Sequence, residues 1–173
     1  MTLLARYISL CSLMACSFGS LGARPAASTT GAALHADTIR ELLKSHNDVR
    51  AHRQIPPLQW SPRLADEAHA WAERLSAMGA LQHDRSRRIG QNLFVSYNEA
   101  KRPSFVVGKW AEESQFYDER RFRCAAGEVC GHFTQIIWRS TKQLGCGVAD
   151  GENGEFWVCF YSPPGNIVGE KPY

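Results

Sequence analysis

The segment FWVCFY, which runs from Phe156 to Tyr161, constrains the fold more than any other part of the chain. Successive side chains of a β-strand point to opposite faces of its sheet, and here both faces are apolar. A strand of this kind has to be covered from both sides. Because the preceding segments carry helical patterns, we predict an α+β fold in which helices cover both faces of a sheet, a three-layer α/β/α sandwich.

Two helices are predicted early in the chain. Residues 37–54 carry apolar side chains at helical spacing, at Ile39, Leu42, Leu43 and Val49. In the second helix, Ser61 is the N-cap, Pro62 takes the first helical position, and the apolar stripe stops at Gly79. These start and stop signals define the second helix more sharply than the first.

A third helix is predicted over residues 103–117, and it carries a carboxylate on its apolar face. Val106, Trp110 and Tyr117 lie along that face, and Glu113 lies among them. A carboxylate is costly to bury unless it is paired or hydrogen-bonded. The structural interpretation is an ion pair with an arginine such as Arg50. The functional interpretation is a role in a binding or metal site.

Four cysteines lie beyond the N-terminal segment, and four cysteines allow three pairings. The segments LGCGVA and FWVCFY flank the turn-rich sequence DGENGE. A hairpin centred on this turn places Cys146 opposite Cys159, where directly paired strand positions bring Cβ atoms to roughly 4.5–5.5 Å. We predict this disulfide, and the second then joins Cys124 to Cys130.

The N-terminus has the layout of a secretory signal, with one arginine, an apolar stretch and then small residues. We predict a signal peptide at residues 1–23, a flexible tether at 24–36 and one folded domain at 37–173. The mature protein is then secreted, in an extracellular or periplasmic compartment where thiols oxidise. The sequence LMAC, which ends at Cys16, also resembles a bacterial lipobox, so the alternative is a membrane-anchored lipoprotein with lipid on Cys16.

The charge balance argues against one class of partner. The chain has 20 Lys and Arg against 17 Asp and Glu, a formal net charge of +3. This is far from the basic excess that phosphate contacts require, so we expect no nucleic-acid binding. Basic runs at 85–88 and 120–123 are most simply solvated loops, but they also fit a membrane surface contact through anionic lipid headgroups.

His132 opens the apolar run GHFTQIIWRST. A lone histidine on an apolar segment is more often a hydrogen-bonded core residue than a ligand, and the same holds for His46 and His83. Two histidines and a carboxylate also suit zinc, with a metal-bound water as the nucleophile of a hydrolase. The sequence contains no HExxH, paired CxxC or GxSxG pattern, so spacing alone gives a weak metal or catalytic signal.

Two long motifs give the chain a family resemblance. GHFTQIIWRST and FWVCFYSPPGN resemble the signature motifs of the CAP superfamily (cysteine-rich secretory proteins, antigen 5, pathogenesis-related class 1). HNDVR at 46–50, GQNL at 90–93 and the ending PPGNIVGEKPY extend the resemblance from about residue 37 to the C-terminus, and the plant pathogenesis-related class 1 type is the most similar. The resemblance implies an α/β/α sandwich of the CAP type with an antiparallel central sheet.

The resemblance also implies a central cleft. By motif, the cleft residues are His83, Gln91, Glu113 and His132. Metal binding at the two histidines is known in the family, so His83 and His132 are the candidate metal ligands, with zinc as an optional rather than a required cofactor. Gln91 stands where a glutamate is frequent. The loss of that carboxylate weakens the case for a divalent cation or for paired acid/base catalysis.

The function that the resemblance implies is non-enzymatic binding of sterols or fatty acids outside the cell, in host-microbe interaction, defence or virulence. Aromatic side chains suit apolar ligands, and Phe116, Tyr117 and Phe122 are candidates for a lipid-binding loop. The alternative for these aromatics is packing at the helix end. We assign no catalytic residues, and the sequence does not address the oligomeric state.

Two rival functions remain. A metal-assisted hydrolase, a protease or an esterase, would use both cleft histidines as ligands and Glu113 as the base. A peptide precursor would release residues 163–173, from Pro163 to Tyr173, because plant relatives carry a signalling peptide at this position.

Overall fold

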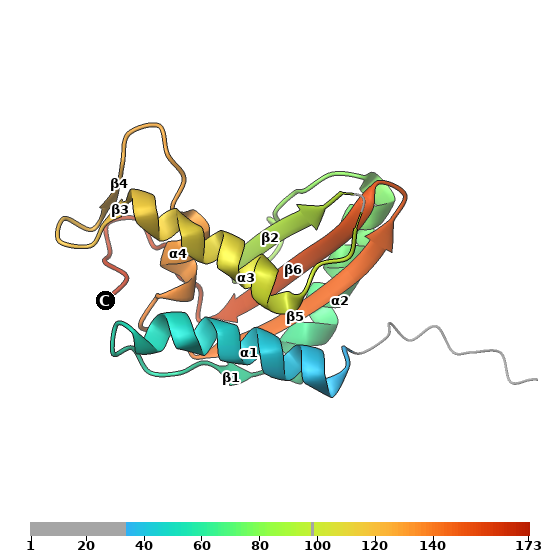
Figure 1. Ribbon diagram of the computed structural model, residues 1–173, viewed down its shortest axis with the longest axis horizontal. Helices are drawn as coiled ribbons and strands as arrows, with labels where there is room; N and C mark the ends of the chain where they lie inside the picture. Colours follow the sequence, from blue (N-terminus) through green and yellow to red (C-terminus); the bar gives the residue numbers. More distant parts are fainter. Residues whose placement is uncertain (1–33, 98) are drawn as a thin grey trace, which may run out of the picture.

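The computed structural model describes residues 34–97 and 99–173. It is a three-layer sandwich in which helices cover both faces of one central sheet (Figure 1). The four-stranded sheet has the order β1-β5-β6-β2, with β1 at Gln59–Trp60, β5 at Gln143–Gly151, β6 at Gly154–Ser162 and β2 at Gly90–Ser96. One face carries α1 (Ala36–Ala51), α3 (Pro103–Glu112) and α4 (Gly131–Ile136), and the other carries α2 (Pro62–Met78). The predicted fold class is confirmed.

The predicted signal peptide and residues 24–33 of the predicted tether lie outside the described residues. Among the residues that the structure describes, no helix has the length and apolar character needed to cross a bilayer.

The expectation of a wholly antiparallel sheet is wrong at one edge. β6 pairs antiparallel with both β2 and β5, but β1 pairs parallel with β5, with Gln59 beside Gln143. A parallel pair needs a long crossover connection, and the chain between β1 and β5 contains α2, β2, α3 and α4. The sheet is therefore mixed.

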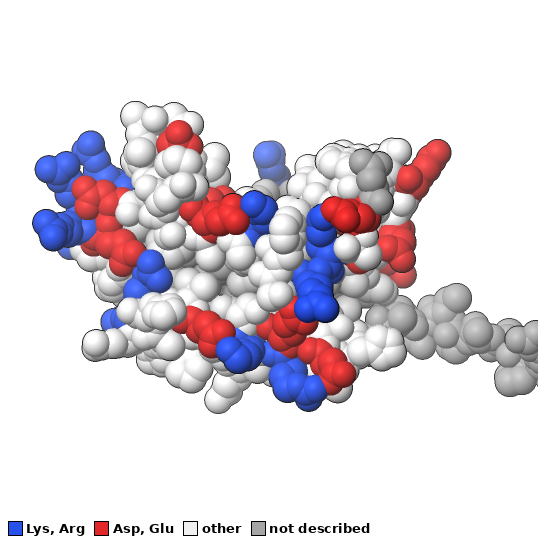
Figure 2. All heavy atoms as spheres, in the orientation of Figure 1, with Lys and Arg blue, Asp and Glu red and all other residues white. Residues whose placement is uncertain are grey.

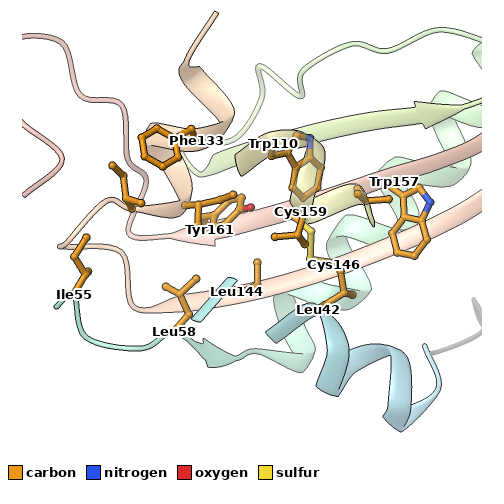
Figure 3. Packing of buried hydrophobic residues seen from close by; sticks show 14 residues of the cluster. Leu42, Ile55, Leu58, Trp110, Phe133, Leu144, Cys146, Trp157, Cys159 and Tyr161 are labelled. Carbon is orange, nitrogen blue, oxygen red and sulfur yellow. A yellow bond between two sulfur atoms is a disulfide. The ribbon is translucent and has the colours of Figure 1, made fainter. Parts of the chain in front are cut away.

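The two faces of β6 fill two separate cores. Trp157, Cys159 and Tyr161 point into the core beneath α1, α3 and α4, where Leu42, Trp110 and Phe133 meet them (Figure 3). The alternate residues Phe156, Val158 and Phe160 pack against α2. The prediction that this strand is covered on both sides is confirmed.

α2 is defined by the caps that its sequence predicts, and it lies very close to the sheet. The Ser61 hydroxyl accepts the Leu64 N–H, and Gly79 ends the helix in the left-handed conformation with φ of 64°. A Cβ at Gly145 of β5 would lie 2.3 Å from the backbone nitrogen of Ala65. Only glycine at this position allows the helix and the strand to approach so closely.

Both predicted disulfides are present. Cys146 and Cys159 are directly paired on β5 and β6, with a Cα–Cα distance of 4.1 Å. Cys124 and Cys130 close a short loop with a Cα–Cα distance of 5.8 Å. The hairpin register therefore selected the correct pairing among the three.

The third helix is shorter than predicted. α3 ends at Glu112, a 3-10 turn η1 covers Glu113–Phe116, and Tyr117 opens the small hairpin of β3 (Tyr117–Asp118) and β4 (Arg123–Cys124). The carbonyl of Phe116 accepts the N–H of Ala125 at 2.8 Å, so the chain is drawn into the hairpin instead of another helical turn. The tertiary contact overrides a helical pattern that the sequence continues to Tyr117.

Candidate functional site

The central pair of the site is His132, at the start of α4, and Glu113, at the end of α3. His132 Nδ1 lies 2.6 Å from Glu113 Oε1, and the two side chains retain 30% and 16% of their exposure. An ionised carboxylate only accepts hydrogen bonds, so Nδ1 carries the shared proton and the imidazole is fixed in orientation. Nε2 is left free for a bond to a ligand.

The same carboxylate also holds the first turn of α4. Glu113 Oε2 accepts the backbone N–H groups of His132 at 2.9 Å and of Phe133 at 3.1 Å. These N–H groups have no partner within the helix, so a carboxylate at this end satisfies them and interacts favourably with the helix dipole. With three hydrogen bonds already accepted, Glu113 acts to orient its neighbour rather than as a free base.

The proposed ion pair between Glu113 and Arg50 is wrong. Arg50 is fully buried, and its guanidinium donates instead to backbone carbonyls, those of Pro56, Ile136, Trp138 and Thr141. Two of these carbonyls lie at the end of α4, where a cation is favourable. Burial is the main reason that the pKa of Arg50 falls to about 10. Arg50 therefore has a structural role, because it joins α1 to the end of α4 and the loop that follows it.

His132 is held from two further sides. Its ring stacks on Trp110, with centroids 6.1 Å apart and an angle of 24° between the planes. Its backbone carbonyl accepts Nδ2 of the buried Asn92 at 3.1 Å. The imidazole is therefore fixed by Glu113 of η1 and Trp110 of α3, and the His132 backbone is fixed by Asn92 of β2.

His83 lies on the exposed loop between α2 and β2, and the neighbouring Gln91 fixes that loop. The Gln91 amide accepts the Asp84 N–H at 2.9 Å and donates to the Asp84 carbonyl at 2.7 Å. Desolvation lowers the pKa of His83, a hydrogen bond with Gln91 acts in the opposite direction, and the charge of His132 lowers it further. The grouping of His83 and Gln91 with Glu113 and His132 in one cleft stays a prediction.

The third histidine weighed from the sequence, His46, is a core residue. It is fully buried, its Nδ1 donates to the Leu42 carbonyl at 2.8 Å, and its Nε2 accepts the Tyr161 hydroxyl at 2.8 Å. Burial lowers its pKa to about 4, so the ring is neutral at physiological pH. The structural interpretation is correct for His46.

The three candidate aromatics of the lipid-binding loop are placed very differently. Tyr117 packs edge-on against Phe133 with ring centroids 5.7 Å apart, and Phe122 packs edge-on against Tyr173 at the same distance. Phe116 is 36% exposed. Of the three, Phe116 is the one that presents its ring to solvent.

A groove that no motif marked lies at the opposite end of the sandwich. It has a volume of about 760 Å³ and lies between the starts of α1 and α3, one face of α2 and the β5–β6 hairpin. Its apolar walls are Leu34, Pro103, Val148, Ala149 and Trp157, and its polar lining is His35, Thr38, His69, Glu73, Ser76, Lys101, Asp150 and Glu155. The sequence gave no signal for it because four segments distant in sequence supply the walls.

Comparison with known proteins identifies the fold and its family. A model of the cysteine-rich secretory protein family, CAP, matches residues 43–161. Pathogenesis-related protein 1A of Nicotiana tabacum is 37% identical over 135 residues, which cover 78% of this chain and 80% of that protein. The chain belongs to the CAP family. The resemblance read from the two signature motifs is confirmed.

Solved CAP structures share the sandwich. Venom allergen-like protein 4 of Schistosoma mansoni aligns with a TM-score of 0.64 at 24% identity, covering 78% of this chain and 92% of that one. NaASP2, solved with Zn²⁺, aligns with a TM-score of 0.61 at 19% identity, covering 83% and 88%. At these identities the likeness shows the CAP fold.

The predicted cleft residues of this chain offer few metal ligands. Within residues 34–97 and 99–173 there is no group of three His, Cys, Asp or Glu side chains placed to hold a metal ion. Nε2 of His132 and the ring of His83 are the donors that remain, since Glu113 already accepts three hydrogen bonds and position 91 is an amide. A cation held here would need solvent or substrate to complete its coordination.

The start of the C-terminal tail of this CAP protein is packed against α4 and the loop that follows it. Gln135 Oε1 accepts the N–H of Gly165 at 3.0 Å, and the Thr141 hydroxyl donates to the Pro163 carbonyl at 2.9 Å. The backbone at the start of the candidate signalling peptide is therefore hydrogen-bonded to side chains of α4 and of the loop that follows it.

The end of the tail is also bonded, while its middle is exposed. The Tyr173 hydroxyl bonds Glu119, which also receives Arg53 Nη2 at 2.6 Å, and the Pro172 carbonyl accepts the Arg139 N–H at 2.6 Å. Burial and the nearby carboxylate raise the pKa of Tyr173 to about 12. Residues 167–171 form an exposed loop between the two attachments.

Proposed function

We propose that this CAP protein acts outside the cell as a non-enzymatic binding protein for a small apolar ligand, a sterol or a fatty acid. The observation that carries the proposal is the groove of about 760 Å³, whose size suits a small ligand. Two disulfides, and a family named for secretory proteins, support an extracellular setting. Similarity to pathogenesis-related proteins supports a role in defence or host-microbe interaction.

The groove combines an apolar wall with a polar rim. Val148 and Trp157 on the sheet, with Leu34 and Pro103 opposite, offer the contacts that an alkyl chain or a sterol ring system needs. Each buried methylene contributes about 0.8 kcal/mol. Lys101 at the rim is ion-paired with Glu99, so the head of a fatty acid would have to take the place of that carboxylate.

The groove is also held firmly in shape. His69 Nδ1 donates to the Val148 carbonyl at 2.9 Å and fixes α2 to β5. Glu155 Oε2 accepts the Lys101 N–H at 3.0 Å and Trp157 Nε1 at 2.7 Å, which ties the start of α3 to the sheet. A preformed groove loses little conformational entropy on binding.

The cleft supports binding better than it supports catalysis. The carboxylate of Glu113 accepts three hydrogen bonds, and the Gln91 amide is bonded twice to the backbone of Asp84. A general base needs a free basic lone pair directed at its substrate; Glu113 keeps one of about four, and the Gln91 amide has no basic lone pair.

Fluorescence titration with dehydroergosterol and with an anthroyloxy fatty acid tests the proposal. Thr38→Trp places a bulky ring in the groove and is expected to weaken binding on the order of ten-fold or more, the loss of about two methylene contacts. His52→Trp, exposed at the other end of α1, is the matched control and should bind normally. Wild-type protein that binds neither probe would refute the proposal. Loss of binding in Phe116→Ser, with Thr38→Trp unaffected, would move the site to the hairpin.

A metal-assisted hydrolase is the second candidate, and the bond between His132 and Glu113 favours it. Metal-binding histidines commonly donate their other ring nitrogen to a carboxylate, as His132 does. NaASP2, a CAP protein of the same fold, was solved with Zn²⁺. Zinc-dependent turnover of an ester or peptide that His132→Ala abolishes would establish this activity, and absence of turnover at saturating zinc would exclude it.

Release of a C-terminal peptide is a separate proposal, and its exposed segment 167–171 supports it. The backbone before Pro163 is less accessible, because the Ser162 carbonyl accepts the Lys142 N–H at 3.0 Å and Tyr161 is fully buried. Cleavage there requires the end of β6 to separate from β5. Mass spectrometry of secreted protein that always finds Tyr173 intact would exclude the precursor function.

A further inference from the structure

Two carboxylates of the β3–β4 hairpin, Asp118 and Glu119, are hydrogen-bonded within the protein but retain 40% and 38% of their side-chain exposure. Glu119 bonds Arg53 and Tyr173, so its charge is neutralised against the body of the protein. Asp118 Oδ1 accepts the backbone N–H groups of Arg120 at 3.0 Å and Arg121 at 3.1 Å, which shapes the turn. Both carboxylates are therefore already hydrogen-bonded, Glu119 to the body of the protein and Asp118 within the turn.

The basic side chains of the same hairpin are exposed to solvent. Arg120, Arg121 and Arg123 are exposed, and Arg120 and Arg123 form no ion pair with any residue of the described chain. Arg121 retains 74% of its side-chain exposure and approaches Asp118 only to 3.8 Å. Figure 2 shows Lys and Arg side chains projecting from the end of the molecule that carries the hairpin, with Asp and Glu side chains closer to the body.

The tip is also rigid. Phe122 takes a left-handed φ of 52° and packs beneath the tip against Tyr173, and Lys171 Nζ lies 4.7 Å above its ring. The disulfide of Cys124 fixes the other strand end. Lys171 therefore adds a fourth cation beside the three arginines, on a hairpin that the Phe122 packing and the disulfide hold in place.

From this charge arrangement we propose that the hairpin tip, Arg120, Arg121 and Arg123 with Lys171, is a docking surface for an anionic lipid membrane. Exposed cations next to a negatively charged leaflet each contribute about a five-fold gain in affinity, and the gain depends on ionic strength. The exposed, apolar ring of Phe116 lies at the base of the same hairpin. The charge of the tip is complementary to an anionic membrane surface, and membrane docking does not require that the groove bind a ligand.

Co-sedimentation with vesicles tests the docking surface. The mature protein is expected to sediment with vesicles of phosphatidylcholine and phosphatidylserine, to ignore vesicles of phosphatidylcholine alone, and to be released as salt is raised from about 0.15 M to about 1 M. The double variant Arg120→Ser with Arg121→Ser should bind anionic vesicles about thirty-fold more weakly.

The second basic run of the chain provides the matched control. Arg85→Ser with Arg88→Ser removes the same charge from an exposed loop on another surface and should retain wild-type vesicle binding. Equal losses in the two double variants would overturn the proposal in favour of net charge. The proposal would also be overturned if wild-type protein did not bind anionic vesicles, even if it bound a soluble polyanion such as heparin.

Two further measurements separate loss of membrane docking from loss of folding and from loss of ligand binding. Thermal unfolding of both double variants should match that of wild type, because the replaced side chains are exposed. Titration with dehydroergosterol reports ligand binding in solution without vesicles, so failure of the groove proposal and failure of membrane docking remain distinguishable.

Discussion

Gln91 holds the backbone of Asp84 through both ends of its amide, accepting the N–H at 2.9 Å and donating to the carbonyl at 2.7 Å. A glutamate at this position, frequent in the family, lacks the donor for the second bond. Compared with a glutamate, the Gln91 amide carries no charge but fixes the loop that bears His83 through two hydrogen bonds. Its contribution does not depend on pH.

Gln91→Glu is accordingly expected to destabilise the protein at neutral pH. The variant loses one hydrogen bond and sets a carboxylate against a carbonyl, which together cost about 1–3 kcal/mol. Urea unfolding measures the loss, and hydrogen exchange at the Asp84 N–H reports loosening of the loop. Gln82→Glu makes the same change at an exposed neighbour and should have little effect. Equal stability of wild type and Gln91→Glu would contradict the assigned role.

Glu113→Gln is expected to release the imidazole of His132. The carboxamide keeps one acceptor oxygen but cannot serve three donors, and a hydrogen bond to a charged group contributes about 1.5–3 kcal/mol. Nitrogen NMR at alkaline pH should show the ring proton on Nδ1 in wild type and a mixture of tautomers in the variant. Glu112→Gln, on the exposed side of the same turn, is the control. An unchanged tautomer in Glu113→Gln would show that other contacts orient the ring.

His46 predicts a specific dependence of stability on pH. Its folded pKa of about 4 lies below the unfolded value of about 6.5, so between these values the unfolded state binds a proton that the folded state does not. The contribution is fully present above about pH 6.5 and is lost as pH falls towards about 4, at about 1.4 kcal/mol per pH unit and about 3 kcal/mol in total.

Chemical denaturation from about pH 7 to about pH 4 measures this slope. His46→Gln removes the titrating ring and should flatten the slope by that amount, although the variant is less stable throughout. His52→Gln, at an exposed position, should keep the wild-type slope. If His46→Gln and wild type lose stability in parallel, other groups cause the acid sensitivity.

Tyr173→Phe is expected to loosen the end of the tail. The hydroxyl bonds Glu119, and loss of one such bond costs about 1 kcal/mol, or about a five-fold increase in local opening. Cleavage after the exposed Glu170 by a glutamate-specific protease should then be faster by a similar factor. Tyr97→Phe, at an exposed tyrosine, is the matched control. Equal cleavage of the two variants would show that the tail is held by its other contacts.

Local patterns predicted the features that local physics decides. The caps Ser61 and Gly79 bound α2 as expected, and the hairpin turn fixed the pairing of Cys146 with Cys159. The apolar strand at 156–161 required two covered faces and received them. Each of these depends on residues a few positions apart, where backbone geometry leaves few choices.

The pairing of Glu113 with His132 followed from motifs, but the roles of the two residues did not. The resemblance named Glu113 and His132 together, yet neither motif indicates that one carboxylate orients the ring and also holds the first turn of α4. The candidate aromatics Tyr117 and Phe122 turned inward because Phe133 and the C-terminal Tyr173 reach them from other segments.

By itself, the sequence determined the layers of the sandwich, the two disulfides and the family, because periodicity, turn chemistry and motifs are encoded locally. Only the tertiary structure decided that Arg50 brackets α4 instead of pairing with Glu113, that β1 runs parallel to β5, and that a groove opens beside Val148. These depend on which distant segments meet. The partners of a buried charge and the walls of a groove come from distant segments, so only the complete fold determines them.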